Sequence, residues 1–79
     1  MAINRTIDIR DVDWPLCLLN CNKEVSQMKN GDQIEIIVKD TDVLNTIVIL
    51  IEQLSNHSIQ KCKENKYYRL IIRKKNDDN

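Results

Sequence analysis

The stretch that decides the fold is TIDIRDVDWPLC, residues 6–17, in which an alternating segment gives way to a short polar loop and then to a helix start. Residues 6–10 alternate polar and apolar side chains, as is typical of a half-buried strand. Ile7 and Ile9 would then face the core. The stretch therefore predicts a strand that leads through a loop into a helix.

The helix that follows has signals at both ends. Asp13 or Trp14 is expected to cap it, with Pro15 in the first turn, where its missing amide hydrogen costs nothing. Asn30-Gly31 would end it, because glycine accepts the left-handed backbone that closes a helix. One face then collects apolar side chains at helical spacing, namely Leu18, Cys21, Val25 and Met28.

Residues 33–39 predict a second strand with three apolar side chains on one face: Ile34, Ile36 and Val38. Asp40 or Thr41 would cap a second helix. Residues 46–51 are rich in β-branched side chains and would form a strand in isolation. The whole segment is too long for one strand, and four side chains fall on one helical face, namely Val43, Ile47, Leu50 and Leu54. We therefore expect a helix.

Two further strands close the pattern, over residues 58–64 and 67–73, with a turn at 64–66. In the last strand three side chains share a face: Tyr68, Leu70 and Ile72. The order β-α-β-α-β-β predicts an α+β fold, a two-layer α/β sandwich with two helices packed on one face of a mixed four-stranded sheet. Residues 1–79 would form a single domain, with an ordered core over about 5–74 and a flexible tail at 75–79.

The composition narrows the function classes. The chain has 79 residues, 12 basic and 12 acidic, so its formal net charge of +0 argues against a dedicated nucleic-acid binder. A domain this small leaves little room for a large cofactor cavity, so no cofactor is expected. Three cysteines, no secretory leader and no apolar run long enough for a membrane predict a cytoplasmic protein with reduced thiols.

The chain resembles the TusA/SirA-like sulfurtransferase family, whose first strand leads through a loop into a helix opened by a Cys-Pro-x-Pro signature. The resemblance rests on residues 7–15, IDIRDVDWP, and on the closing run 68–74, YRLIIRK. Along that pattern Trp14 stands where the family has its persulfide cysteine. Pro15 matches the first proline and Cys17 replaces the second. The resemblance implies the β-α-β-α-β-β fold and a role related to sulfur transfer.

In that family, the cysteine of the Cys-Pro-x-Pro signature accepts sulfur from a cysteine desulfurase or related donor and passes it to an acceptor protein. A helix start suits this chemistry because free amide hydrogens and the macrodipole stabilise a thiolate. An indole cannot carry a persulfide. Cys17, about 60° from the centre of the buried stripe, is expected on a partly exposed flank. It would be either a displaced catalytic thiol or a small half-buried packing residue.

The other cysteines and the histidine suggest no catalytic centre. Cys21 falls within the buried stripe and Cys62 is isolated, so both are expected to pack structurally, and the thiols fall short of a metal site. His57 is expected to be a solvated loop residue.

An apolar surface for a protein partner is also predicted. Trp14 would be either a plug over the helix end or an exposed anchor for a partner. Leu16 and Leu19 face away from the buried stripe of the first helix. Ile49 does the same on the second, with Val48 near the edge. These four helix residues either form a contiguous partner surface or reflect a normal apolar fraction beside a wide buried stripe. The candidate docking site is Trp14, Pro15, Leu16 and Leu19.

Basic residues concentrate near the end of the chain, where they either form a solvated face or contact an acidic partner or RNA: Lys61, Lys63, Lys66, Arg69, Arg73, Lys74 and Lys75. The preferred hypothesis is a divergent, non-catalytic family member that acts through contacts with a cysteine desulfurase or a sulfur acceptor. The alternatives are an active carrier using Cys17 and a small RNA-binding domain using the basic hairpin. Whether the protein is an enzyme stays open.

Overall fold

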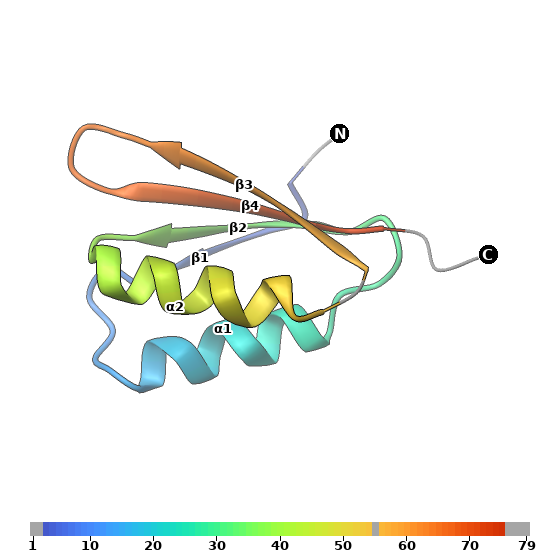
Figure 1. Ribbon diagram of the computed structural model, residues 1–79, viewed down its shortest axis with the longest axis horizontal. Coiled ribbons are helices and arrows are strands. Elements are labelled where there is room, and N and C mark those ends of the chain that lie inside the picture. The colour runs from blue at the N-terminus through green and yellow to red at the C-terminus, as the bar shows by residue number, and fades with distance from the viewer. Residues whose placement is uncertain (1–2, 55, 76–79) are drawn as a thin grey trace.

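The computed structural model describes residues 3–54 and 56–75, and its secondary structure follows the predicted order. The elements are β1 (Arg5–Asp8), α1 (Leu16–Ser26), β2 (Gln33–Val38), α2 (Thr41–Glu52), β3 (His57–Lys63) and β4 (Tyr68–Lys74). Both helices lie on one face of the sheet (Figure 1). The predicted α+β two-layer sandwich is confirmed.

The four strands form one mixed sheet in the order β1-β2-β4-β3. β1 pairs with β2 in parallel, whereas β4 pairs antiparallel with both β2 and β3. The register places Ile36 opposite both Ile7 and Leu70, and Ile34 opposite Ile72. Because side chains alternate along each strand, this register gathers the predicted apolar residues on the face that the helices cover.

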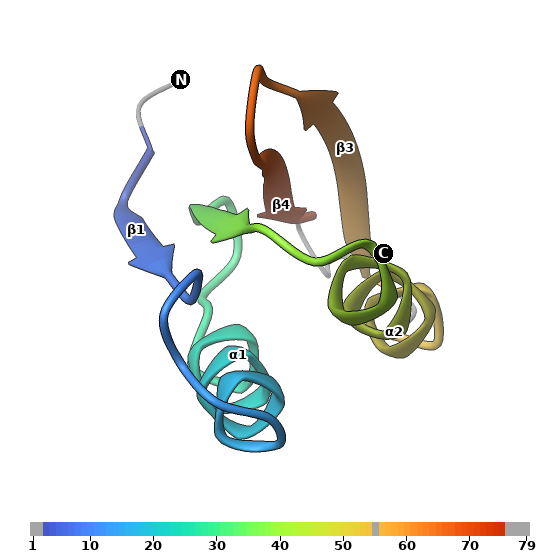
Figure 2. The same ribbon diagram turned by 90° about the vertical axis from the view of Figure 1, so that its left-hand side faces the viewer.

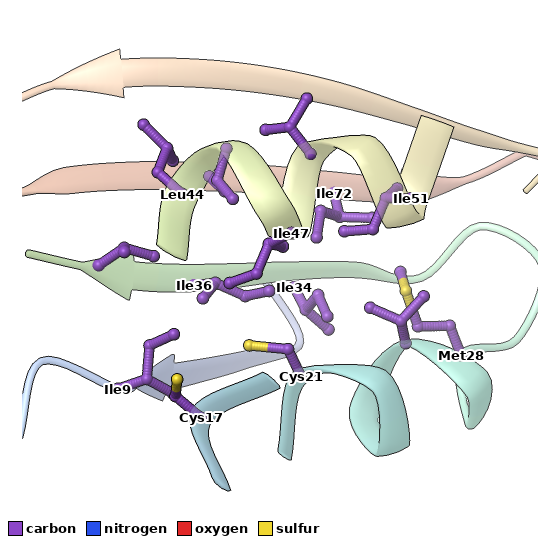
Figure 3. Close-up of a cluster of buried hydrophobic side chains, with 14 residues drawn as sticks. Ile9, Cys17, Cys21, Met28, Ile34, Ile36, Leu44, Ile47, Ile51 and Ile72 are labelled. Carbon is purple, nitrogen blue, oxygen red and sulfur yellow. The ribbon is translucent and has the colours of Figure 1, made fainter. Parts of the chain in front are cut away.

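The core lies between that face and the helices (Figure 3). The sheet contributes side chains that are fully or almost fully buried: Ile34, Ile36, Val38, Leu70 and Ile72. α1 contributes Cys17, Cys21 and Val25, and α2 contributes Leu44, Ile47, Val48 and Ile51. The face expected for β2 and β4 is therefore confirmed, with Tyr68 partly buried against its edge.

Residues 46–51 are helical, as the longer window predicts, and Asp40 caps α2 by accepting a hydrogen bond from the backbone N–H of Asp42 (2.8 Å). The predicted buried face was partly wrong. Ile47 is buried, but Leu50 and Leu54 are exposed and Val43 is only half-buried. The segment is apolar on most of its circumference, so periodicity alone does not determine which side faces the sheet.

Helix α1 also departs from the prediction at both ends. It begins at Leu16 with Pro15 as the N-cap residue, and neither Asp13 nor Trp14 caps it through a side chain. It ends at Ser26, before Asn30-Gly31. Gly31 has a φ of +86° in the following turn, where its N–H donates to the carbonyl of Lys74 (2.8 Å). The glycine therefore serves the turn into β2 rather than the helix end.

The remaining boundary differences are small. β1 ends at Asp8, although Ile9 is buried as expected. β3 starts one residue early, at His57, and β4 runs to Lys74. The N–H of Lys75 donates to the carbonyl of Asn56 (2.7 Å), so the last strand is held beyond its end. The rest of the predicted tail, 76–79, lies outside the described residues.

The observed face of α2 predicts unequal costs for two neighbouring truncations. Ile51→Ala should lower the free energy of unfolding by about 2–5 kcal/mol, because Ile51 is 3% exposed. Leu50→Ala should cost about 1 kcal/mol or less, because Leu50 is 38% exposed. Urea titration followed by circular dichroism measures both, with Ile51→Val as a milder variant if Ile51→Ala does not fold. Equal costs would contradict the observed orientation.

Candidate docking site at the start of helix α1

The candidate site lies at the end of the sheet where β1 and β2 finish and both helices begin. Parallel strands end at the same edge, so the loop before α1 and the loop before α2 meet there. Figure 2 views the molecule from this end, with the β3–β4 hairpin above and the helix starts below. Lys39, Asp40 and Val43, from the second loop and α2, consequently surround the first loop.

The loop between β1 and α1 is held by backbone hydrogen bonds. The N–H of Ile9 donates to the carbonyl of Ile37 (3.0 Å), and that of Val12 donates to the carbonyl of Ile9 (3.2 Å). The N–H of Cys17 donates to the carbonyl of Asp13 (3.0 Å). Ile9 is buried in the core, so the loop is anchored to the core as well as by these backbone hydrogen bonds.

Trp14 is 57% exposed. The prediction that it plugs the helix end is therefore wrong, and the alternative prediction of an exposed side chain is confirmed. The indole borders two shallow cavities. One, of about 300 Å³, is shared with Asp40, Asp42, Val43 and Thr46 of the α2 start. The other, of about 210 Å³, has Cys17 in its lining and Asp13 at its side. Trp14 therefore lies between the two helix starts with part of the indole open to solvent.

Cys17 is 2% exposed, so the expected partly exposed flank was wrong. Figure 3 shows it beside Ile9, on the sheet side of α1. The buried stripe of α1 runs through Cys17, Cys21 and Val25, so it is centred closer to Cys17 than the predicted stripe, and Leu18 is only half-buried at its edge. The thiol lies in the lining of the smaller cavity beneath the loop. A reactant reaches it only where that cavity opens.

The other two thiols occupy different environments. Cys21 is buried, and this burial raises the pKa of its thiol to about 12, with a smaller contribution from the nearby Cys17. It is therefore a neutral packing group at physiological pH, as expected. Cys62 is half-buried on β3, opposite Arg69 of β4. Within residues 3–54 and 56–75, no three His, Cys, Asp or Glu side chains are arranged to hold a metal ion.

Leu16 and Leu19 are exposed on α1, as predicted, and Pro15 is exposed beside them. Ile49 is exposed on α2. Val48 was expected near the edge of the patch, but it is buried with the core of α2. The apolar surface next to Trp14 is thus carried by α1, and the four-residue patch across both helices was wrong in including Val48.

His57 is not a solvated loop residue, because it is the first residue of β3 and is half-buried. Neither ring nitrogen touches solvent or has a hydrogen-bond partner among the described residues. Desolvation lowers the pKa of the imidazole, and the nearby charge of Lys74 lowers it further. The ring is therefore held in its neutral form.

The basic residues near the chain end are not one free surface. Arg69 is paired with Glu35 and, at 3.3 Å, with Glu64. The ammonium of Lys74 donates to the carbonyl of Met28 (3.1 Å). The charge of Arg69 is consequently compensated within the fold and Lys74 is held against the backbone, which weakens the RNA-binding alternative.

Sequence reasoning missed the contribution of the β2–α2 loop to the Trp14 site. It treated Asp40 only as a helix cap and gave Lys39 no role. The available signal was the topology itself, since two parallel strands bring their following loops to one edge. A strand-order prediction would have placed these residues around Trp14.

The thiols predict an order of reactivity. In the native protein, iodoacetamide should label the half-buried Cys62 first, and should label Cys17 and Cys21 at least about tenfold more slowly, because their exposure requires local opening. Peptide mass spectrometry over time measures the three rates, with urea-unfolded protein as the reference. Labelling of Cys17 as fast as Cys62 would contradict its burial.

His57 predicts a loss of stability in weak acid. Its pKa is lower in the folded than in the unfolded chain, so the unfolded state binds more protons as the pH falls below the usual 6.5. The free energy of unfolding should decline in that range, and His57→Gln should flatten the decline. Arg69 lowers the pKa of Glu35, so Glu35 changes the free energy of unfolding only at pH values below the usual glutamate pKa of 4.5. An unchanged pH profile in His57→Gln would refute the assignment.

The comparisons with known proteins agree with this fold. A sequence model of the family described as sulfurtransferase TusA matches residues 5–74, which is most of the chain. No curated protein matches the chain. Among the described residues, no helix is long and apolar enough to cross a membrane.

Proposed function

The chain belongs to the TusA sulfurtransferase family and so has a role related to sulfur transfer, and we propose that it fills this role as a non-catalytic docking protein. Proteins of the family work with other proteins in sulfur relay. In this proposal the chain contacts a cysteine desulfurase or a sulfur acceptor through Trp14, Pro15, Leu16 and Leu19. The observation that carries it is an exposed indole where the family resemblance places the persulfide cysteine.

The absence of an accessible thiol at this loop supports the non-catalytic part. Sulfur relay requires a thiolate that two large proteins reach in turn. Trp14 has no sulfur, and Cys17 lies 2% exposed beneath the loop. Moving Cys17 outward would require rotating α1 out of the core or breaking the hydrogen bond from its N–H to Asp13.

The exposed side chains support the docking part. Tryptophan is enriched among the residues that dominate interface energy, because it buries a large area at a small conformational cost. Trp14 lies on a loop anchored at Ile9, and Leu16 and Leu19 sit on the regular helix that follows. A partner would therefore meet a preorganised apolar surface, which reduces the entropy lost on binding.

A reducing compartment fits the three cysteines, which are all unpaired. We propose a cytoplasmic location, where thiols stay reduced. The proposal needs no cofactor on the chain itself.

The sulfur-carrier question is tested by intact-mass spectrometry after incubation with a cysteine desulfurase, cysteine and pyridoxal phosphate. The native chain should gain no sulfur, because it has no exposed thiol at the loop. Trp14→Cys should gain one sulfur atom, since it restores a thiol at the helix start, where amide hydrogens stabilise a thiolate. A gain in the native chain that Cys17→Ser abolishes would instead establish Cys17 as a displaced carrier.

The docking surface is tested by calorimetric titration of the native chain against the desulfurase and against purified sulfur acceptors. Trp14→Ala should weaken the interaction by about 2 kcal/mol or more, roughly thirtyfold. Ile49→Ala is the matched control, because Ile49 is as exposed as Trp14 but lies on α2. Equal affinity of Trp14→Ala and the native chain would exclude the proposed surface.

A further inference from the structure

A third cavity at the same end of the sheet is not lined by Trp14 and has a different chemistry. It has a volume of about 210 Å³ and lies between the β3–β4 hairpin and the end of β2. Its lining contains three lysines and two tyrosines, together with Glu64 and Asn65: Lys39, Lys63, Lys66, Tyr67 and Tyr68. The hairpin that forms it projects at this end of the molecule (Figure 1).

The strand register brings the lysines together. Tyr68 of β4 is opposite Lys63 of β3 on one side and Val38 of β2 on the other, and Lys39 follows Val38 directly. Adjacent strands are about 4.8 Å apart, so the backbones of Lys39 and Lys63 are separated by roughly 10 Å across Tyr68. Both side chains line the cavity. Lys66, in the turn, adds a third ammonium.

The positive charge of this cavity is not neutralised within the fold. Lys39, Lys63 and Lys66 form no ion pair among the described residues and are exposed. The acidic side chain in the lining, Glu64, accepts a hydrogen bond from Arg69 (3.3 Å). Three like charges around one cavity repel one another, so an anion placed among them lowers the electrostatic energy.

We propose that this lysine-lined cavity binds the carboxylates of a short acidic segment on a protein partner. The proposal goes beyond the docking role of Trp14 and stands without it. Lysine ammoniums are compact charges that donate to a carboxylate in many orientations. The cavity volume of about 210 Å³ suits one or two acidic side chains.

The surroundings disfavour a long polyanion such as RNA. The neighbouring cavity shares Lys39 but is also lined by Asp13 and Asp40, whose carboxylates would repel a continuous phosphate backbone. The ring of Tyr67 is covered by the guanidinium of Arg10, 5.1 Å from its centroid, so that face is closed to a stacked base.

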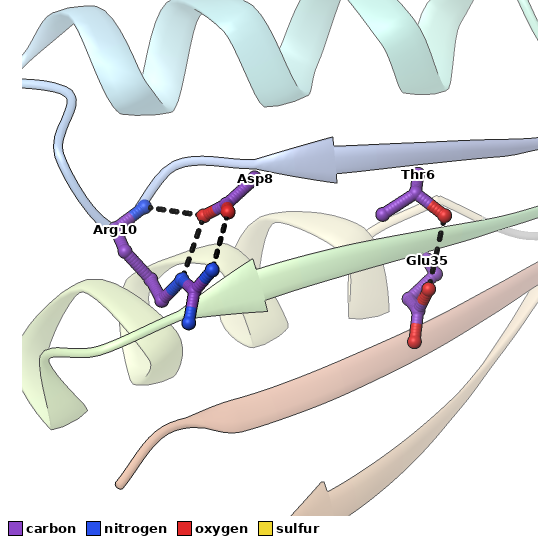
Figure 4. A network of polar contacts seen from close by, with 4 residues as sticks. All are labelled: Thr6, Asp8, Arg10 and Glu35. Carbon is purple, nitrogen blue, oxygen red and sulfur yellow. Dashed lines mark hydrogen bonds and ion pairs between the residues drawn. The ribbon is translucent and has the colours of Figure 1, made fainter.

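Arg10 is in turn paired with Asp8. Its Nε and Nη2 donate to the two carboxylate oxygens of Asp8 at 2.9 and 2.7 Å (Figure 4). This pairing lowers the pKa of Asp8, chiefly through the side-chain hydrogen bond. The arginine therefore closes the tyrosine face while its own charge is compensated, and the lysines remain the anion-binding groups.

The test is a titration of the isotopically labelled chain followed by amide NMR shifts. The probes are a blocked tetraglutamate peptide, the tetraglutamine peptide of the same length, and oligouridylate RNA. Tetraglutamate should shift the amides of Lys39 and of residues 63–68 saturably, and added salt should weaken it. Tetraglutamine should leave these amides in place.

Paired charge variants complete the test. Lys63→Gln with Lys66→Gln should weaken tetraglutamate binding about fivefold, because two of the three ammoniums are gone. Lys23→Gln with Lys61→Gln removes the same net charge outside the cavity and should leave affinity within about twofold. Equal weakening in both pairs, or no saturable shift, would overturn the proposal. RNA binding tighter than tetraglutamate at the same amides would replace it with a nucleic-acid site.

Discussion

The rest of the structure depends on one constraint, the burial of a single face of the central β2–β4 pair. Ile34 and Ile36 on β2 pair with Ile72 and Leu70 on β4, and these side chains have almost no contact with solvent. A slip of one residue would turn every one of them outward, so the apolar pattern sets the register. Both helices must then cover this face, and the other face is left for paired charges such as Glu35 and Arg69.

That constraint also positions the site. With β1 parallel to β2, each strand leads into a helix on the same side, and the two loops meet at one edge. Trp14 lies on the first loop and Lys39 on the second. The β3–β4 hairpin reaches the same edge because β4 runs antiparallel to β2. An apolar surface and a lysine-lined cavity therefore occupy one end of a small domain.

The order of elements and the buried faces of the strands could be predicted from the sequence. The alternation of residues along β2 and β4 is compatible with burial of only one face of each strand. The sequence was insufficient for the helices. Leu50 and Ile51 are both aliphatic, and only packing against the sheet shows which is buried. For Cys17 the error lay in centring the buried stripe of α1 on Leu18, since only packing against the sheet shows that Cys17 is buried and Leu18 is half-buried.

The surroundings of Trp14 and the grouping of the lysines around one cavity could not be predicted from the sequence, for a different reason. Both depend on contacts between segments far apart in the chain. The surroundings of Trp14 come from residues 40–46, and the lysine-lined cavity joins residue 39 to residues 63–68. Local patterns contain no information on such pairings until strand order is known.

The shared edge has one more electrostatic property. Since α1 and α2 both begin there, the positive ends of their macrodipoles add. Asp13, Asp40 and Asp42 border the cavities beside Trp14 and oppose that potential. A thiolate at the same position would be stabilised by the macrodipoles and the free amide hydrogens and opposed in part by these carboxylates, whereas an indole is indifferent to both. Because the indole at the helix start is uncharged, the side chains around it need not stabilise an anion. Acidic residues at this edge therefore do not destabilise the residue at position 14.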